Sequence, residues 1–272
     1  MRMSKLQKFG IYTLLIVCAV IVFFPIAFSI LLSFSNNADI ANGVYIPKTI
    51  NFENYINAFS AQPLLHYIKN SVIVASVSTG LIIILSLLAS YSFVFMDFKG
   101  KNLIFGIFMA TMMIPGEVLV ISNFQTIRGL GMIDTFAGLI LPTLASTFGI
   151  FLLRQNLKQI PYELKEASEV AGVSNFYFFR KVVVPMAKNS IVTLGIYNFL
   201  VSWNSYMWPL LSTTNTKVRT VQIGLRQLKS TELLNDYGMI AAGAMIVSLP
   251  ILLLILFGQS KLQEGLTKGA LK

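Results

Sequence analysis

The sequence predicts an all-α integral membrane protein with six transmembrane helices. Hydrophobic residues make up 55% of the 272 residues and charged residues only 12%, with a mean hydropathy of +0.72. The apolar residues also gather in six runs that carry almost no charge. A soluble domain of this length has too little interior for so much apolar surface, so the excess is expected to face lipid.

Each of the six runs is long enough to cross a hydrocarbon core of about 30 Å, which takes about 20 helical residues. Backbone groups in lipid must bond within their own segment, so runs of this length are expected to be helices. Transmembrane strands would alternate apolar and polar residues over about 10 positions, and that pattern is absent. We predict one transmembrane domain over residues 1–272, with spans at 11–33, 70–95, 103–124, 135–154, 189–211 and 238–260.

The first run follows a basic flank formed by Arg2, Lys5 and Lys8, as the apolar part of a secretory signal would. Its apolar stretch is too long for a signal peptide, whose apolar region has 7–15 residues, and no small-x-small cleavage site closes it. We therefore predict that residues 11–33 form a retained helix.

The third run contains the only acidic residue inside a predicted span, Glu117, directly after Pro115 and Gly116. A charged side chain within the bilayer costs about 2.5–3.5 kcal/mol on insertion scales, so it is expected to face a cavity or a partner. The Pro-Gly pair favours irregular backbone, which membranes tolerate beside a water-filled path. Either Glu117 lines a translocation pathway, or the span is short and Glu117 lies at the external interface.

The fifth run carries a polar and aromatic patch formed by Trp203, Asn204, Ser205, Tyr206 and Trp208. Aromatic rings stack on sugar faces, and an amide can bond to hydroxyl groups. The aromatic residues would equally suit a belt at the external membrane surface. Asn204 is harder to place in a belt, and both interpretations stay open.

The loops predict the orientation in the membrane. With the N-terminus in the cytoplasm, the 21 lysines and arginines divide about two to one in favour of the inside. Cytoplasmic loops carry such an excess of basic residues. Both termini are therefore expected inside, in agreement with an even number of spans.

Composition also excludes several kinds of site. Cys18 and His66 are the only cysteine and histidine, which excludes an intrachain disulfide and a Cys/His metal cluster and leaves one possible base for a nucleophilic triad. The net charge of +10 comes from residues spread over short loops, so no nucleic-acid partner is expected. We predict no enzymatic activity and no metal or cofactor bound by this chain.

The loop between the fourth and fifth runs, residues 156–188, is longer than a connection needs. Pro161 suits a first helical position, and Glu163 and Glu166 would lie near the positive end of that helix. Gly172 is placed as its C-terminal stop. The sequence therefore predicts a short helix from Pro161 to Gly172.

A second short helix is expected directly afterwards, with Ser174 placed to cap it and Pro185 to end it. On the first helix Ala167, Ser168 and Ala171 stand at spacings of three and four, so they share a face that a partner can approach closely. The loop is either a docking element for another protein or an amphipathic helix that rests on lipid. The residues alone leave the two interpretations open.

The loop resembles the EAA loop of bacterial ABC importer permeases, in which Glu-Ala-Ala is followed by three residues and Gly, then by nine residues and Ile-x-Leu-Pro. Here Glu166-Ala167-Ser168 is followed at that spacing by Gly172, and then by Val182-Val183-Val184-Pro185. Ser168 replaces the second alanine, valines replace Ile and Leu, and Ala171 stands where the family usually has Asp. The order of helix, stop, second helix and proline agrees throughout.

Further segments resemble the carbohydrate-type branch of these permeases, the maltose/glycerol-3-phosphate-like group. They are Ile46-Pro47 with the stretch 50–55, Asn70-Ser71 at the start of the second run, Trp203-Asn204 with Trp208-Pro209-Leu210, and the C-terminal residues 265–272. The resemblance covers most of the chain, and members of this branch have six spans.

The resemblance implies a binding-protein-dependent importer in the bacterial cytoplasmic membrane. The chain would form half of a translocation pore with a second homologous permease. Two cytoplasmic ATPase subunits would dock on the EAA loops, where Glu166, Ala167, Ser168, Gly172 and Pro185 would form the ATPase contact. An extracytoplasmic solute-binding protein would deliver a sugar, an oligosaccharide or a glycerol-phosphate-like solute.

The sequence carries no phosphate-binding loop of its own. Gly100-Lys101 lacks the glycine five residues earlier, where Phe95 stands, and Asn102 follows instead of Ser or Thr. ATP and Mg²⁺ are therefore expected on the partner ATPase subunits.

The alternative function is an ion-coupled secondary transporter, which usually needs intramembrane ionisable groups and paired repeats. Only Glu117 qualifies as such a group. An integral membrane enzyme would need convergent acids, bases or metal ligands, which the scattered carboxylates do not supply.

Overall fold

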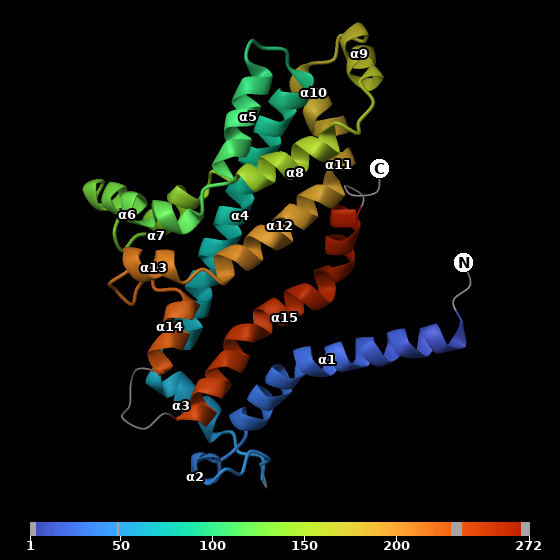
Figure 1. The fold of residues 1–272 in the computed structure, drawn as a ribbon. Coiled ribbons are helices and arrows are strands. Elements are labelled where there is room, and N and C mark those ends of the chain that lie inside the picture. Colours follow the sequence, from blue (N-terminus) through green and yellow to red (C-terminus); the bar gives the residue numbers. More distant parts are fainter. Residues whose placement is uncertain (1–3, 48, 230–235, 268–272) are drawn as a thin grey trace. The chain divides into compact units, whose positions relative to one another are not determined.

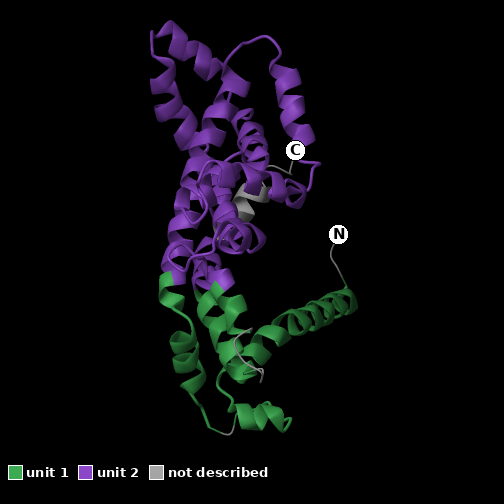
Figure 2. Cartoon of the chain, turned by 90° about the vertical axis from the view of Figure 1, so that its left-hand side faces the viewer, with its two compact units in different colours: residues 1–66, 224–249 green, residues 67–223, 250–272 purple. Residues whose placement is uncertain are grey.

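The computed structural model describes residues 4–47, 49–229 and 236–267, and these residues form helices and connecting turns without a strand (Figure 1). The chain divides into two compact units, one of residues 1–66 and 224–249 and the other of residues 67–223 and 250–272 (Figure 2). The end of the C-terminal segment that resembles the permease signature, residues 268–272, lies outside the described residues.

The first unit contains α1 (Lys5–Ser33), α2 (Asn37–Ala41) and α3 (Glu53–Ala61). Helix α1 begins at a capping box: Ser4 Oγ accepts from the Gln7 backbone N–H at 3.2 Å, and Gln7 Oε1 accepts from the Ser4 N–H at 2.9 Å. Most of α1 is apolar and exposed. A long helix that is apolar on all sides suits lipid or a membrane-embedded partner. The helix predicted at 11–33 is confirmed, whereas its retention in the protein stays a prediction.

Asn54 of α3 joins the elements of the first unit. Its buried amide donates to the carbonyl oxygens of Ser33 at 3.0 Å and Ser35 at 2.8 Å. The start of α15 (Tyr237–Thr267) lies directly on this amide, because a Cβ on Gly238 would stand 2.5 Å from Asn54 Nδ2. Glycine at position 238 therefore allows a close packing that any other residue would open.

The second unit holds the remaining helices, together with the rest of the two long helices α4 and α15 that begin in the first. In chain order its elements are α4 (Leu64–Phe95), α5 (Lys101–Thr111), η1 (Gly116–Leu119), α6 (Val120–Gly129), α7 (Phe136–Ile140), η2 (Leu141–Thr143), α8 (Thr147–Leu157), α9 (Glu163–Val170), α10 (Asn175–Phe178), η3 (Phe179–Val183), α11 (Val184–Met186), α12 (Lys188–Trp203), α13 (Met207–Ser212) and the start of α14 (Val221–Leu228).

Among the described residues, three helices are long and apolar enough to cross a membrane unbroken: α1, α4 and α15 up to Gln259. The count rises to five if two bent helix pairs each form one span. The structure therefore confirms an all-helical protein with several candidate spans, but it does not confirm the predicted number of six. The orientation N-in and C-in stays a prediction.

The predicted third span, residues 103–124, is not one helix. Helix α5 ends at Thr111, and the segment Gly116–Gly129 leaves at 90° to it. Pro115 has an extended backbone, with ψ of 131°, and lacks the N–H that would continue the helical ladder. The irregular backbone expected at this Pro-Gly pair is confirmed, and its bend is sharper than a kinked span would have.

The predicted fourth and fifth spans are also broken, which the prediction of single helices at 135–154 and 189–211 missed. Residues 136–143 and 147–157 meet at 50°, because Pro142 lies in the 3₁₀ turn η2 and Ser146 then caps α8 by accepting from Gly149 N–H at 3.0 Å. Helix α12 ends at Trp203, and a short turn separates it from α13.

The Asn70-Ser71 pair at the start of the predicted second span fixes a distant segment. The Asn70 amide donates to the carbonyl oxygens of Lys217 and Arg219, both at 3.0 Å. Ser71 Oγ accepts from the backbone N–H of Val221 at 2.9 Å. The two polar side chains therefore hold the stretch before α14 against α4.

Candidate functional site

The loop singled out from the sequence folds as a helix, a tight turn and a second helical segment. Helix α9 ends in a left-handed residue, Gly172, with φ of +68°. The Gly172 N–H donates to the Glu169 carbonyl at 3.0 Å and the Val173 N–H to the Ser168 carbonyl at 2.9 Å, which closes the helix in the manner of a glycine C-cap. The predicted stop is confirmed.

The beginnings of the two helices agree closely with the sequence. Helix α9 starts at Glu163, with Tyr162 as its N-cap, so Pro161 lies two positions before the first helical residue instead of occupying that position as predicted. Ser174 caps α10 as expected, since its Oγ accepts from the Tyr177 N–H at 3.3 Å. Glu163 and Glu166 both lie in the first turn of α9, where the helix dipole favours negative charge.

Pro185 does not end the second helix, and this prediction is wrong. The backbone widens into the π-helical turn η3 and continues as α11, with Pro185 near its first position. A proline has no N–H for the carbonyl one turn earlier, and a π turn is a common way for a helix to absorb such an interruption. The helical path breaks only at Ala187, before α12.

The outer face of this helix–turn–helix segment is open. Glu166, Ala167 and Gly172 are exposed, and Ser168 is half-buried with its hydroxyl donating to the Lys165 carbonyl at 2.7 Å. Two apolar side chains beside them are unusually free: Val170 is 91% exposed and Phe176 is 70% exposed. We call the exposed face of residues 163–177 the docking face.

Lys165 was missed by the sequence analysis. It is buried, although its helix is otherwise exposed or half-buried. Its ammonium donates to Glu169 Oε1 and to Asn175 Oδ1, both at 2.6 Å. The spacing of four between Lys165 and Glu169 was a visible signal for the first contact, but nothing in the sequence indicated the second.

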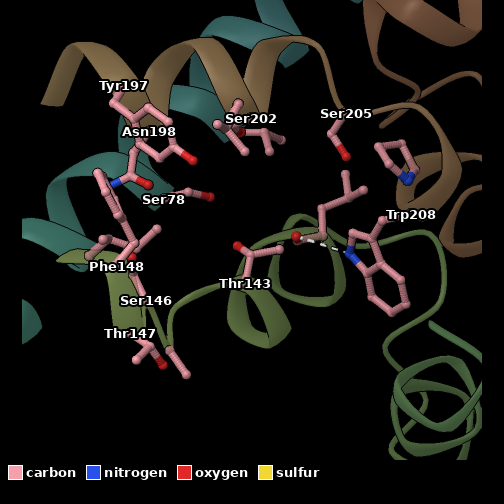
Figure 3. A pocket seen from close by; sticks show the side chains of 16 residues that line it. Ser78, Thr143, Ser146, Thr147, Phe148, Tyr197, Asn198, Ser202, Ser205 and Trp208 are labelled. Carbon is pink, nitrogen blue, oxygen red and sulfur yellow. Dashed lines mark hydrogen bonds between the residues drawn. The ribbon is translucent and has the colours of Figure 1, made fainter. Parts of the chain in front are cut away.

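A cavity of about 300 Å³ lies elsewhere in the second unit, among α4, α8, α12, α13 and the turn after α7 (Figure 3). Its wall combines hydroxyl, amide and aromatic groups with aliphatic side chains, and none of the described residues that line it is charged. Its small polar side chains include Ser78, Thr143, Ser146, Asn198, Ser202 and Ser205.

Two buried polar groups of this wall have no hydrogen-bond partner among the described residues: Ser78 Oγ and Asn198 Nδ2. Ser78 is 2% exposed and Asn198 is 7% exposed, and Figure 3 shows both at the same end of the cavity. A buried amide or hydroxyl without a partner costs about 1–3 kcal/mol. The pair is therefore equipped to bond an uncharged polar ligand.

Trp208 closes the other end of the cavity. Its indole N–H donates to the Leu139 carbonyl at 3.2 Å (Figure 3), which joins α13 to α7. Because that donor is already used, the ring offers its apolar surface to the cavity rather than a polar group.

Of the residues predicted to line a pathway, Ser205 and Trp208 line this cavity, whereas Glu117, Trp203, Asn204 and Tyr206 do not. Trp203 is almost fully buried and stacks on Phe199. Asn204 is exposed, and its amide donates to the Leu200 carbonyl at 2.9 Å. Glu117 is exposed at the bend after α5. Tyr206 precedes α13, whereas its neighbours Ser205 and Trp208 reach the cavity.

A carboxylate outside the predicted spans holds the segment before α14. Asp134 Oδ1 accepts from the backbone N–H groups of Thr214 at 2.6 Å and Asn215 at 2.7 Å. Partial burial alone would raise the pKa of Asp134, but these bonds, a bond from the Thr214 hydroxyl and nearby Arg219 hold it below its ordinary value. Within the described residues, no three His, Cys, Asp or Glu side chains gather as metal ligands would.

Residues 82–260 match the family described as "Binding-protein-dependent transport system inner membrane component". The chain is 31% identical over 251 residues to the trehalose transport system permease protein SugB of Mycobacterium tuberculosis, covering 91% of this chain and 92% of that protein. It is 31% identical over 268 residues to the sn-glycerol-3-phosphate transport system permease protein UgpE of Rhizobium meliloti, covering 94% and 95%.

The fold is shared with a solved structure. A chain of a bacterial ABC transporter involved in the import of the acidic polysaccharide alginate superposes with a TM-score of 0.83 and 23% identity, over 96% of this chain and 99% of that one.

Proposed function

The chain belongs to the family of binding-protein-dependent transport system inner membrane components, and from this premise we propose that it is the permease subunit of an ATP-driven carbohydrate importer. A member of this family is a multi-pass protein of the cytoplasmic membrane and works with an ATPase and a solute-binding protein. The whole chain, residues 1–272, would act as one permease domain with both termini in the cytoplasm.

The helix–turn–helix segment carries the proposal. Its docking face stands free, with Glu166 and Ala167 exposed and Gly172 at the turn. An exposed apolar side chain such as Val170 in a short polar helix suits a protein partner better than water. Glu166, Ala167, Ser168 and Gly172 would contact the ATPase, and Pro185 would lie in the helical stem that carries them.

The partner assembly would consist of a second homologous permease, two ATPase subunits and an extracytoplasmic solute-binding protein. ATP and Mg²⁺ would be bound by the ATPase subunits, and the chain itself would perform no catalysis. Closure of the ATPases would move the docking faces and, with them, the membrane helices.

The solute is proposed to be an uncharged sugar or oligosaccharide. Proteins similar to this chain are named for trehalose, for arabinooligosaccharides and for sn-glycerol-3-phosphate. The cavity favours the first two, because hydroxyl and amide groups line it without a lysine or arginine among the described residues. A phosphate group would need cationic or backbone N–H partners, whereas Ser78 and Asn198 suit hydroxyl groups.

The solute pathway would pass this cavity at the break between α12 and α13. Asn204 and Tyr206 flank Ser205, which reaches the cavity, and Trp203 would support the break from its buried side. Glu117, exposed at the bend after α5, would border the pathway closer to water. These four assignments are proposals that the adjacent cavity supports.

An affinity-tagged copy of the chain in its native membrane tests the assignment. The expected result is that an ATPase subunit and a second permease co-purify with it. Gly172→Leu would strain the left-handed turn, since a side chain at φ of +68° is unfavourable, and Glu166→Trp would block the docking face. Both variants should insert into the membrane but lose the ATPase.

Lys158→Ala supplies the control, because Lys158 is exposed on the same loop but lies before α9. If the wild-type chain brings down neither partner, or transports its solute without ATP, an ion-coupled secondary transporter becomes the better assignment.

A further inference from the structure

Lys165 is a buried lysine on α9, a helix whose other side chains are exposed or half-buried. Its side chain is 4% exposed, while that of its acidic partner Glu169 is 59% exposed. A lysine rarely gives up water unless its charge is matched by hydrogen bonds. Here two acceptors at 2.6 Å, Glu169 Oε1 and Asn175 Oδ1, replace the lost water. The ammonium also lies 5.7 Å from the centroid of the Phe178 ring.

The bond from Lys165 to Asn175 is the only side-chain hydrogen bond that joins α9 to another element in the part of the chain described by the structure. The turn between the two helices is otherwise held by the backbone bonds at Gly172 and Val173. Ala171 stands beside that glycine and has no polar group to contribute. Without Lys165, no side-chain hydrogen bond among the described residues would link α9 to α10, and the backbone bonds of the glycine turn would remain.

Asn175 and Phe178 connect Lys165 to the core of the second unit. Phe178 is fully buried and packs edge to face on Phe95 of α4, with ring centroids 5.4 Å apart. Tyr91 of α4 donates its hydroxyl to the Asn175 carbonyl at 3.4 Å and packs on Phe179. The start of α10 is thus fixed on the end of α4.

We propose that Lys165 is the positioning residue that makes the docking segment (α9, the turn at Gly172 and α10) rigid, so that a displacement of α9 is passed through Asn175 and Phe178 to α4. The proposal rests on the function proposed above. Lys165 lies on the inner side of α9, away from the docking face, and therefore acts on transmission rather than on ATPase binding. Replacing it should leave the ATPase docked but the cavity unresponsive to nucleotide.

A reporter in the cavity measures this response without knowledge of the solute. The complex is purified with Cys18→Ser, which removes the single free thiol, and with Ser202→Cys as the reporter. The rate of maleimide labelling is compared between the nucleotide-free complex and the complex trapped with ADP and vanadate. With Lys165 present, the two rates should differ on the order of fivefold or more, the usual size of coupling between two sites.

Lys165→Met keeps most of the length of the unbranched side chain but removes its donors. We expect equal amounts of ATPase to co-purify, while the two labelling rates come to differ by less than about twofold. Lys181→Met is the matched control, because Lys181 is exposed in the same loop, and it should behave as the parent. The double variant Lys165→Glu with Glu169→Lys rebuilds the pair, and the Asn175 amide can then donate to the new carboxylate, so the response should return.

A normal nucleotide response in Lys165→Met would overturn the proposal. It would also be overturned if Lys165→Met lost the ATPase, since Lys165 would then serve docking, or if the double variant stayed unresponsive while still binding the ATPase. Failure of the parent complex to carry any ATPase would instead contradict the proposed function itself.

Discussion

Gly138→Ala should be among the most destabilising single-methyl changes in the second unit. A Cβ at position 138 would stand 2.2 Å from the carbonyl oxygen of Met132, and that oxygen belongs to the backbone, so no side-chain rotation relieves the clash. The same carbonyl accepts from Thr135 Oγ1 at 2.8 Å, and Thr135 Oγ1 accepts from the Gly138 N–H at 3.0 Å. The turn from Met132 to Gly138 is thus closed on itself.

The expected size follows from two terms. Forcing one extra carbon into a packed site costs about 1–3 kcal/mol, and disturbing the Thr135 N-cap costs about 1 kcal/mol more. We therefore expect a loss of about 2–4 kcal/mol in the free energy of unfolding. Because Leu139 follows directly and lines the cavity, the cavity wall should move with the turn.

Gly106→Ala is the matched control. Gly106 lies in the interior of α5, and a Cβ there would meet no atom within 4 Å. Alanine in a helix interior gains about 0.5–1 kcal/mol over glycine. Thermal unfolding of the detergent-solubilised protein, followed by the loss of native tryptophan signal, should show opposite shifts for the two variants. Equal midpoints for Gly138→Ala and the parent would refute the reasoning.

Three further predictions concern the polar contacts. Asp134→Asn keeps a side chain that tolerates φ of +58° but loses the charge. The pKa of Asp134 is held below its ordinary 3.8, so the carboxylate stabilises the fold above that pH, and this stabilisation is lost as the pH falls through the lower pKa of the folded state. The difference in thermal unfolding between the parent and the variant should therefore shrink below about pH 4. Asn70→Ala removes both bonds to Lys217 and Arg219 and should cost about 2 kcal/mol, with faster proteolysis of the segment before α14; unchanged proteolysis would contradict this. Asn198→Ala removes an amide nitrogen without a partner, so unfolding should shift by less than about 1 kcal/mol, whereas solute uptake should fall; normal uptake would remove Asn198 from the pathway.

The long helices could be predicted from sequence because their signal is local. Charge-free apolar runs located α1, α4 and the apolar part of α15. Helix α4 begins at Leu64 rather than at residue 70. The predicted span started at residue 70 because the charge-free run begins after Lys69, but a helix can include a charged residue where it lies outside the hydrocarbon. The breaks were harder to predict. Pro142 and the cap at Ser146 are ordinary residues within an apolar run, and only their combination bends the chain by 50°.

The docking segment could be predicted for the same reason, and the cavity could not. Gly172 and Ser174 act within one turn of their own helices, so their residue types suffice. Ser78 and Asn198 are separated by more than a hundred positions, and their shared cavity follows from how α4 packs against α12. The partners of Lys165 likewise depend on where the turn places Asn175.

The π turn η3 sets the direction in which the docking segment points. A π turn holds one residue more than an α turn, so it rotates everything before it by about 100° relative to an unbroken α-helix. Deleting a single residue between Phe179 and Val183 would remove the extra residue together with the widened turn, so this stretch would become plain α-helix and α9 would keep nearly its present direction. Closing the turn to α geometry without a deletion would instead rotate α9 by about 100°. The direction of α9 therefore depends on the match between the number of residues and the width of this turn.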